Sequence, residues 1–209
     1  MQRQEFSEIG LKTIRNENMW IRFGSMWLLG LAVLFLAWCL SFRSLPENIL
    51  QGSSAVYYVP VKAQNVDMTF MRIFLWNICV GCIPVALGSL VRVKDVPLGY
   101  FLAFYHWGMY GILLGTNSFV IPGFGKILPS LTTLFSGSGI YEITAYTLIS
   151  AATFALYYRT GNASLTLDSA DQGKTFLLKL SKAELAFLAL AIVVLAVSNY
   201  YEAWNIFHI

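Results

Sequence analysis

Residues 136–158 read "SGSGIYEITAYTLISAATFALYY", a long apolar run with a single carboxylate, Glu142, close to its start. No further charge follows until Arg159. An apolar helix of about 20 residues is long enough to cross the hydrocarbon core of a bilayer, which is about 30 Å thick. The run therefore predicts a membrane-spanning helix, and it raises the question of what an acid does at one end of it.

The composition of the whole chain also indicates a lipid environment. Of the 209 residues, 57% are hydrophobic and only 12% are charged, whereas about 25% of residues are charged in soluble domains. A water-soluble domain of this size has too little interior to bury so much apolar surface. The net charge is only +3 and the basic residues are scattered between apolar runs, so nucleic-acid binding has no support.

Four further runs are similarly long and nearly free of charge, and they cover residues 23–42, 73–91, 96–125 and 185–201. The first is too long for the core of a cleavable signal peptide, so we interpret it as a retained anchor. Ser181 and Glu184 form a capping-box pattern in front of the last run, which predicts a helix start there. We predict an all-α polytopic membrane bundle of about five transmembrane helices, in a single integral membrane domain over residues 1–209.

Basic residues between the runs predict the orientation, because short cytoplasmic loops carry an excess of lysine and arginine. With five spans, segment 1–21, "RVKD" (92–95) and loop 159–182 fall on one side of the membrane. The basic residues of the opposite side, where loop 43–66 lies, are spread over longer stretches. We therefore expect a plasma-membrane protein with a cytoplasmic N-terminus and an external C-terminus.

Segment 117–137 is apolar, yet Pro122, Gly123, Gly125 and Pro129 interrupt it. We expect a half-helix over residues 126–135 that either lies at the outer interface or re-enters the membrane. Irregular backbone at membrane depth is tolerated only where protein or water satisfies its polar groups. Broken elements of this kind line substrate sites in some transporters.

Polar side chains inside the predicted helices are the candidate functional residues, because embedded polar groups are costly and often functional. Their distances from the ends of the runs place Glu142 and Glu202 near one outer edge, with Arg72 at a similar height as a counter-charge. Asn77 and His106 lie about 15 Å deeper, close to the midplane, at a helical rise of about 1.5 Å per residue. We expect the amide and the imidazole to bond each other, a backbone carbonyl or a water.

These residues also have a structural interpretation. Carboxylates at an interface can simply reach headgroup water, and an Asn–His pair can hold two helices together by about 0.6 kcal/mol. Small residues supply the packing, since they let helices approach closely. The predicted packing glycines are Gly108, Gly111, Gly115 and Gly139. Pro84, which lies between Gly81 and Gly88, predicts a kink in the second helix.

The order of these motifs is Asn77 on one helix, then Tyr110-Gly111-x-x-x-Gly115, Ser138-Gly139-x-x-Glu142 and Glu202-Ala203-Trp204. From about Asn77 to Trp204, the chain resembles the stage II sporulation protein M family of integral membrane proteins. Tyr110 and Ser138 depart from the family pattern, which has Asn and His there. The resemblance implies a five- or six-span bacterial or archaeal membrane protein without an established enzymatic activity. Some relatives act in envelope remodelling during spore engulfment, and others accompany transport ATPases.

We expect a non-catalytic component of a larger envelope or transport assembly, either a scaffold or a permease-like accessory subunit. The chain has no G-x-x-x-x-G-K-[ST] motif, so any ATP-driven step would need a separate subunit. The expected partners are the lipid bilayer and other proteins, such as a separate transport ATPase or further copies of this chain. We expect neither a cofactor nor a metal, since His106 and His208 are the only histidines.

Two other functions stay open on the sequence alone. The first is a stand-alone permease or channel in which Glu142 and Glu202 bind a cation or a proton, while Asn77 and His106 line the path. The second is an intramembrane hydrolase that uses Ser138 or Ser136 with His106. The depths of Ser138 at the outer edge and His106 near the midplane argue against it, because a nucleophile and its base must come within about 3 Å.

Overall fold

The computed structural model describes residues 13–51, 65–93, 96–119, 125–156 and 180–208. The described part is mostly helical, as the sequence predicts. Its elements are α2 (Met19–Ser44), α3 (Val66–Trp76), the π-helix η1 (Asn77–Cys82), α4 (Ile83–Gly88), β1 (Arg92–Val93), β2 (Val96–Pro97), α5 (Leu98–Gly115), α6 (Leu131–Ser136), α7 (Gly139–Thr153) and α9 (Lys182–His208). The two short strands pair antiparallel and connect α4 to α5.

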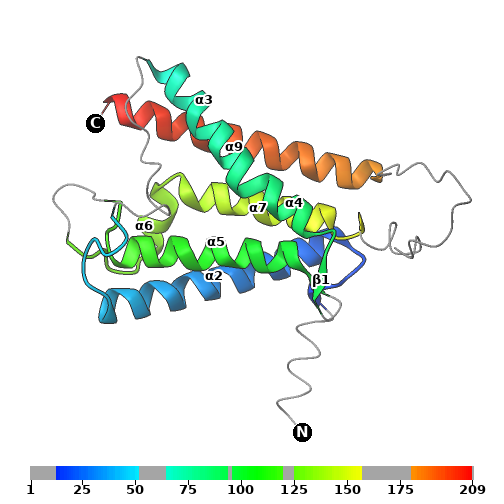
Figure 1. Cartoon of the computed structure of the whole chain (residues 1–209), viewed down its shortest axis with the longest axis horizontal. Helices are drawn as coiled ribbons and strands as arrows, with labels where there is room; N and C mark the ends of the chain where they lie inside the picture. The colour runs from blue at the N-terminus through cyan, green and yellow to red at the C-terminus, as the bar shows by residue number, and fades with distance from the viewer. Residues whose placement is uncertain (1–12, 52–64, 94–95, 120–124, 157–179, 209) are drawn as a thin grey trace, which may run out of the picture.

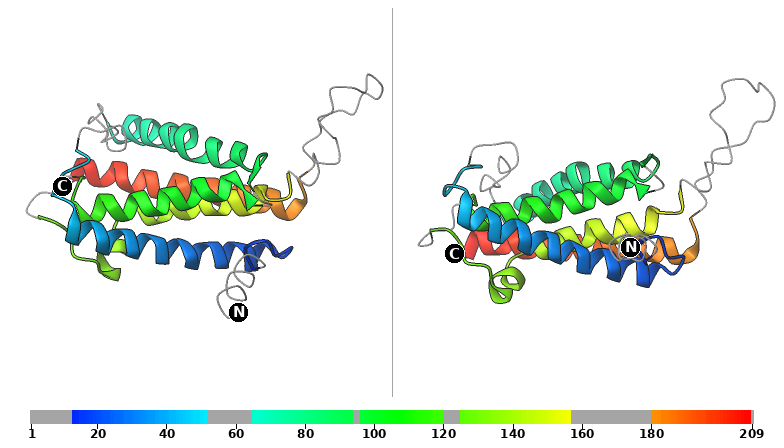
Figure 2. Two further views of the ribbon diagram at one scale, coloured as in Figure 1. Left: turned by 60° about the horizontal axis from the view of Figure 1, so that its bottom comes forward. Right: turned by 90° about the horizontal axis from the view of Figure 1, so that it is seen from below.

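The long helices lie side by side as a bundle (Figures 1 and 2), in which α3, η1 and α4 form one continuous rod. Successive rods run in opposite directions, so the start of α7 lies beside the end of α9 (Figure 1). Helix α7 is central, because α2, α4, α5, α9 and η1 all pack against it. Every residue from 145 to 153 is buried, which is the pattern of a helix enclosed by protein on all sides.

Three helical segments of the described chain are long and apolar enough to cross a membrane: Met19–Ser44, Val66–Gly88 and Lys182–His208. Their outward faces carry large exposed apolar side chains, among them Leu28, Leu36, Val193 and Val197. These surfaces suit lipid and suggest a membrane location. The predicted count of five spans is not established, because α5 and α7 do not meet the same criteria of length and hydropathy.

Glycines set the close packing of α5 against α2. A Cβ added at Gly111 or Gly115 would collide with backbone atoms of α2. Gly139, at the start of α7, lies against the ring of Tyr110, so a Cβ there would collide as well. Gly108 differs from the prediction, because a Cβ there would meet only one α2 methyl group at 3.6 Å. Three of the four predicted packing glycines therefore lie at close contacts.

The interruption expected near Pro84 takes the form of a π-helical turn. The backbone N–H of Ile83 donates to the carbonyl of Ile78, five residues back. Pro84 has no N–H and its ring crowds the carbonyl four residues earlier. Single π-helical turns interrupt long helices and are one of the causes of sharp kinks. This turn sets the position of Asn77, the first residue of η1.

The predicted half-helix over residues 126–135 is shorter and begins later than expected. Ser130 is the N-cap of α6, and its hydroxyl accepts the N–H of Thr133 at 3.1 Å. The residues before it are held by α2 instead. Trp38 Nε1 donates to the carbonyl of Ile127 at 2.7 Å, and Lys126 Nζ donates to the carbonyl of Phe42 at 2.8 Å. Because these two bonds hold residues 126 and 127 against α2, the two residues are not part of α6.

Several predicted segments lie outside the described residues. They include most of the N-terminal segment 1–21, most of loops 43–66 and 159–182, and residues 120–124. Many of the basic residues on which the orientation depends belong to these segments. The orientation of the chain therefore stays a prediction.

Candidate functional site

Six polar side chains from η1, α7 and α9 meet inside the bundle, where α7 begins and α9 approaches its end. We call them the polar cluster: Asn77, Ser138, Glu142, Tyr146, Asn199 and Glu202. The antiparallel packing of α7 against α9 brings the first turns of one helix to the last turns of the other. This packing explains how residues more than 60 positions apart in the sequence become neighbours.

The two carboxyl groups of the polar cluster lie beside each other. Glu142, in the first turn of α7, interacts directly with Glu202 of α9 and with the Asn77 amide. Ser138 Oγ, just before α7, donates to Glu202 Oε2 at 3.1 Å. Both acids are half-buried. The sequence-based expectation that these two acids reach one level therefore agrees with the geometry.

A chain of hydrogen bonds connects the three helices below the acids. The Tyr146 hydroxyl donates to Asn77 Oδ1 at 3.0 Å, and Asn77 Nδ2 donates to Asn199 Oδ1 at 3.1 Å. Asn199 is fully buried. The ring of Tyr146 lies over Gly81, where a Cβ would collide with it. Only glycine at this position lets Tyr146 lie close enough to η1 to reach Asn77.

Two atoms of the polar cluster are left without a partner among the described residues. They are Glu142 Oε1 and Asn199 Nδ2, and both are buried. One is a hydrogen-bond acceptor and the other a donor. A buried polar atom without a partner is destabilising by about 1–3 kcal/mol, so each of these two atoms is a place where a bound group could add a hydrogen bond.

His106 and Asn77 do not bond each other, contrary to one of the expected pairings. His106 Nδ1 contacts the carbonyl of Leu102 at 2.7 Å, and its ring packs against the ring of Tyr146 at 4.8 Å between centroids. Tyr146 thus separates the imidazole from the amide. The Ser138 hydroxyl donates to Glu202 and His106 Nδ1 contacts Leu102, so neither of these bonds joins Ser138 to His106.

The structure does not bring Arg72 to the two acids as the expected counter-charge. Its side chain is exposed, and no ion pair between it and either acid occurs in the described part of the chain. The buried face of α3 is formed by Thr69 and Ile73. Arg72 precedes Ile73 by one residue and therefore points about 100° away around the helix.

Sequence reasoning missed two members of the polar cluster, Tyr146 and Asn199. Tyr146 lies one helical turn after Glu142, and Asn199 lies three residues before Glu202. Residues three and four apart share one face of a helix. The spacing of Tyr146 from Glu142, and of Asn199 from Glu202, therefore indicated that each acid has a polar neighbour on the same helix face.

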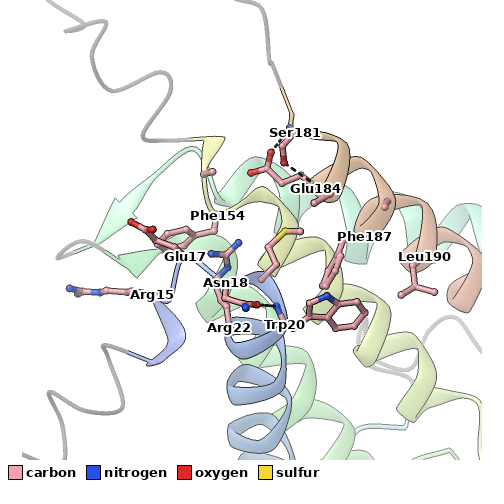
Figure 3. Close-up of a pocket in the computed structure, with 14 residues that line it drawn as sticks. Arg15, Glu17, Asn18, Trp20, Arg22, Phe154, Ser181, Glu184, Phe187 and Leu190 are labelled. Carbon is pink, nitrogen blue, oxygen red and sulfur yellow. Dashed lines mark hydrogen bonds between the residues drawn. The ribbon is translucent and has the colours of Figure 1, made fainter.

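A separate pocket of about 920 Å³ lies between the first turns of α2 and α9 and the end of α7, at the opposite end of the bundle (Figure 3). Its lining includes Arg22, Trp20, Phe187 and Glu184. At its edge Ser181 and Glu184 form the predicted capping box, in which Glu184 Oε2 accepts the N–H of Ser181 at 2.5 Å and Ser181 Oγ accepts the N–H of Glu184 at 3.3 Å.

Arg22 is buried in the wall of this pocket and ties α2 to α7. Its Nε and Nη2 donate to the carbonyl of Ala151 at 3.1 and 2.7 Å, and its Nη1 donates to the carbonyl of Asn16 at 2.6 Å. The guanidinium also lies over the Phe154 ring at 4.6 Å. Because the last carbonyls of a helix have no partner within it, Arg22 caps α7, and we interpret it as a structural residue.

The fold and the site define a class: a helical bundle suited to lipid, with two neighbouring acids in an internal polar cluster. No protein-family model, curated protein or solved structure matches this chain. The functional argument therefore rests on the residues themselves.

Proposed function

We propose that this chain is a plasma-membrane protein of five spans, in which α5 and α7 cross the bilayer together with the three longer rods. Helix α5 has 18 residues, which is about 27 Å at 1.5 Å per residue. Helix α7 is shorter, but α2, α5 and α9 surround it, so its ends need not reach the headgroups. With five spans, the distribution of basic residues supports a cytoplasmic N-terminus and an external C-terminus.

In this proposal the chain is a non-catalytic, permease-like subunit of a larger transport or envelope assembly. The observation that carries it is the polar cluster, because ionisable groups inside a membrane bundle are rare and usually functional. Large aromatic side chains are exposed on the same part of α9 and at the start of α7, namely Tyr200, Tyr201, Trp204 and Tyr141. They offer a surface to a partner subunit or to the interfacial region of the bilayer.

The resemblance to the stage II sporulation protein M family supports this proposal through the positions that carry it. Asn77, Glu142 and Glu202 come from three separate motifs of that resemblance, and all three are members of the polar cluster. Motifs far apart in a sequence are expected to gather where a family shares a site. Relatives that accompany transport ATPases suggest the kind of partner: a separate ATP-hydrolysing subunit or a second copy of this chain.

Purification of the tagged chain from its native membranes in a mild detergent tests the assembly. We expect a co-purifying membrane protein or ATPase at a fixed stoichiometry. Replacing both Tyr201 and Trp204 with alanine should lower its recovery, while Leu36→Ala, at an exposed apolar site on α2, should not. A chain that purifies from native membranes only as a stable monomer would contradict the assembly.

A second candidate is a stand-alone permease that uses Glu142 and Glu202. It is favoured by the direct contact between the two acids, since paired carboxyl groups inside transporters bind protons and cations. Its test is flux into vesicles that contain the purified chain alone. Glu142→Gln should abolish the flux, and Glu47→Gln, which changes an exposed acid outside the polar cluster, should leave it intact. Absence of flux with the wild-type chain would remove this candidate.

A further inference from the structure

The charged and titratable side chains around Glu142 and Glu202 determine what the two acids can bind. The titratable side chains that face them are Cys82 of η1, Tyr110 of α5 and Tyr146 of α7, and His106 packs behind Tyr146. Among the described residues, no lysine or arginine contacts either acid. Two ionised carboxylates side by side in an apolar medium repel strongly. The pair must therefore lose one charge or gain a cation.

We propose that Glu142 and Glu202 form a proton-binding site, in which the two carboxyl groups share one exchangeable proton and a bound water connects them to Asn199. The proton neutralises one acid, and the shared hydrogen bond stabilises the other as an anion. Carboxyl groups in close contact adopt this state in other proteins, because both cannot ionise together. The inference deepens the second function proposed above, since it names the ligand of that site.

The two unpartnered atoms supply the place for the water. Glu142 Oε1 is a buried acceptor and Asn199 Nδ2 a buried donor, both without a partner among the described residues. Asn199 Oδ1 is already used, because it accepts from Asn77 at 3.1 Å. A water between these atoms would donate to Glu142 and accept from Asn199. Buried waters commonly satisfy polar groups in this way.

The neighbouring hydrogen bonds favour a proton over a metal ion. A hard cation such as Ca²⁺ takes 6–8 oxygen ligands. Around this pair, Asn77 Oδ1 already accepts from Tyr146 and Asn199 Oδ1 accepts from Asn77, while the Ser138 hydroxyl donates to Glu202. These oxygens already take part in hydrogen bonds, and no group of three or more His, Cys, Asp or Glu side chains that could hold a metal ion occurs among the described residues. A proton needs only the two carboxyl groups.

Infrared difference spectroscopy of the full chain in lipid nanodiscs at neutral pH tests the proposal. A protonated carboxyl group has a carbonyl stretching band that ionised surface acids lack. We expect one such band in the wild-type protein, shifted when H₂O is replaced by D₂O. Glu142→Gln and Glu202→Gln should each remove it, because the partner left behind no longer shares a proton. Glu47→Gln should leave the band unchanged, and Asn199→Ala should shift it without removing it.

Three results would overturn the proposal: no band in the wild-type protein, a band that survives both glutamine variants, or a band that Na⁺ removes and choline at equal ionic strength does not. The last would show that the pair binds sodium instead. If one glutamine variant does not fold, the other still tests the band. Flux into vesicles is a separate measurement. An infrared band without flux contradicts only the stand-alone permease. Flux without the infrared band contradicts only the shared proton.

Discussion

At the scale of single residues, the geometry of the polar cluster depends on a missing side chain. Gly81 leaves the space in which the Tyr146 ring lies, and the hydroxyl of that tyrosine bonds Asn77. In an ordinary helix interior glycine is unfavourable by about 1 kcal/mol relative to alanine. Here the close contact outweighs that preference, because the ring lies where a Cβ would be.

Gly81→Ala should therefore displace Tyr146 and break its bond to Asn77. We expect a loss of about 1–3 kcal/mol in the free energy of unfolding, which is typical of overpacking in a dense core. The measurement is unfolding of the detergent-solubilised chain, followed by size-exclusion chromatography after heating. Gly24→Ala is the matched control, since a Cβ at Gly24 of α2 has nothing within 4 Å. Equal stability of the two variants would refute the role of Gly81.

Arg22 gives a second prediction at this scale. Its planar guanidinium donates from two nitrogens to Ala151 and from the third to Asn16, a geometry that a lysine ammonium cannot reproduce. Arg22→Lys should lower the free energy of unfolding by about 2 kcal/mol, the value of a charged hydrogen bond. Arg43→Lys, at an exposed site in the last turn of α2, should have little effect. A similar loss in both variants would contradict the capping of α7.

At the scale of helices, α7 is unusual because protein encloses it. Its polar residues Thr147, Ser150 and Thr153 are all buried. Thr147 accepts from Trp107 Nε1 at 2.9 Å, and Thr153 donates to Ser89 at 2.8 Å. Side chains of this kind hold neighbouring helices together where no water competes. The central position of α7 thus explains why a helix with few charges contains so many hydroxyl groups.

The contact between α2 and α5 provides the prediction at this scale. Gly111 lies against the α2 backbone, whereas a Cβ at Gly108, three residues earlier, would make only an ordinary contact with one α2 methyl group at 3.6 Å. Gly111→Ala should separate the two helices and destabilise the chain by about 1–3 kcal/mol. Gly108→Ala should change stability by no more than about 0.5 kcal/mol. Thermal unfolding in detergent compares them directly, and a more harmful Gly108→Ala would show that the packing is assigned to the wrong glycine.

At the scale of the whole molecule, sequence reasoning predicted the helical class and the meeting of Glu142 with Glu202. Both predictions depend on the lengths of the apolar runs and on the positions of residues along the helices, and these can be read from the sequence. It did not predict that Arg72 points away from the acids, because the rotation of a helix about its axis depends on which face its neighbours bury. For the same reason Tyr146 was missed, since its contact with Asn77 depends on the space at Gly81.

The central claim is that the start of α7 and the end of α9 lie at the same face of the membrane. It is tested most directly by labelling intact cells with a membrane-impermeant maleimide, in a chain whose Cys39, Cys79 and Cys82 are replaced. Ser136→Cys and His208→Cys probe that face, and Glu17→Cys probes the opposite end of the bundle; all three positions are exposed. We predict labelling at 136 and 208 in intact cells, and at 17 only after permeabilisation. Labelling of 136 and 208 from opposite sides of the membrane would contradict the account.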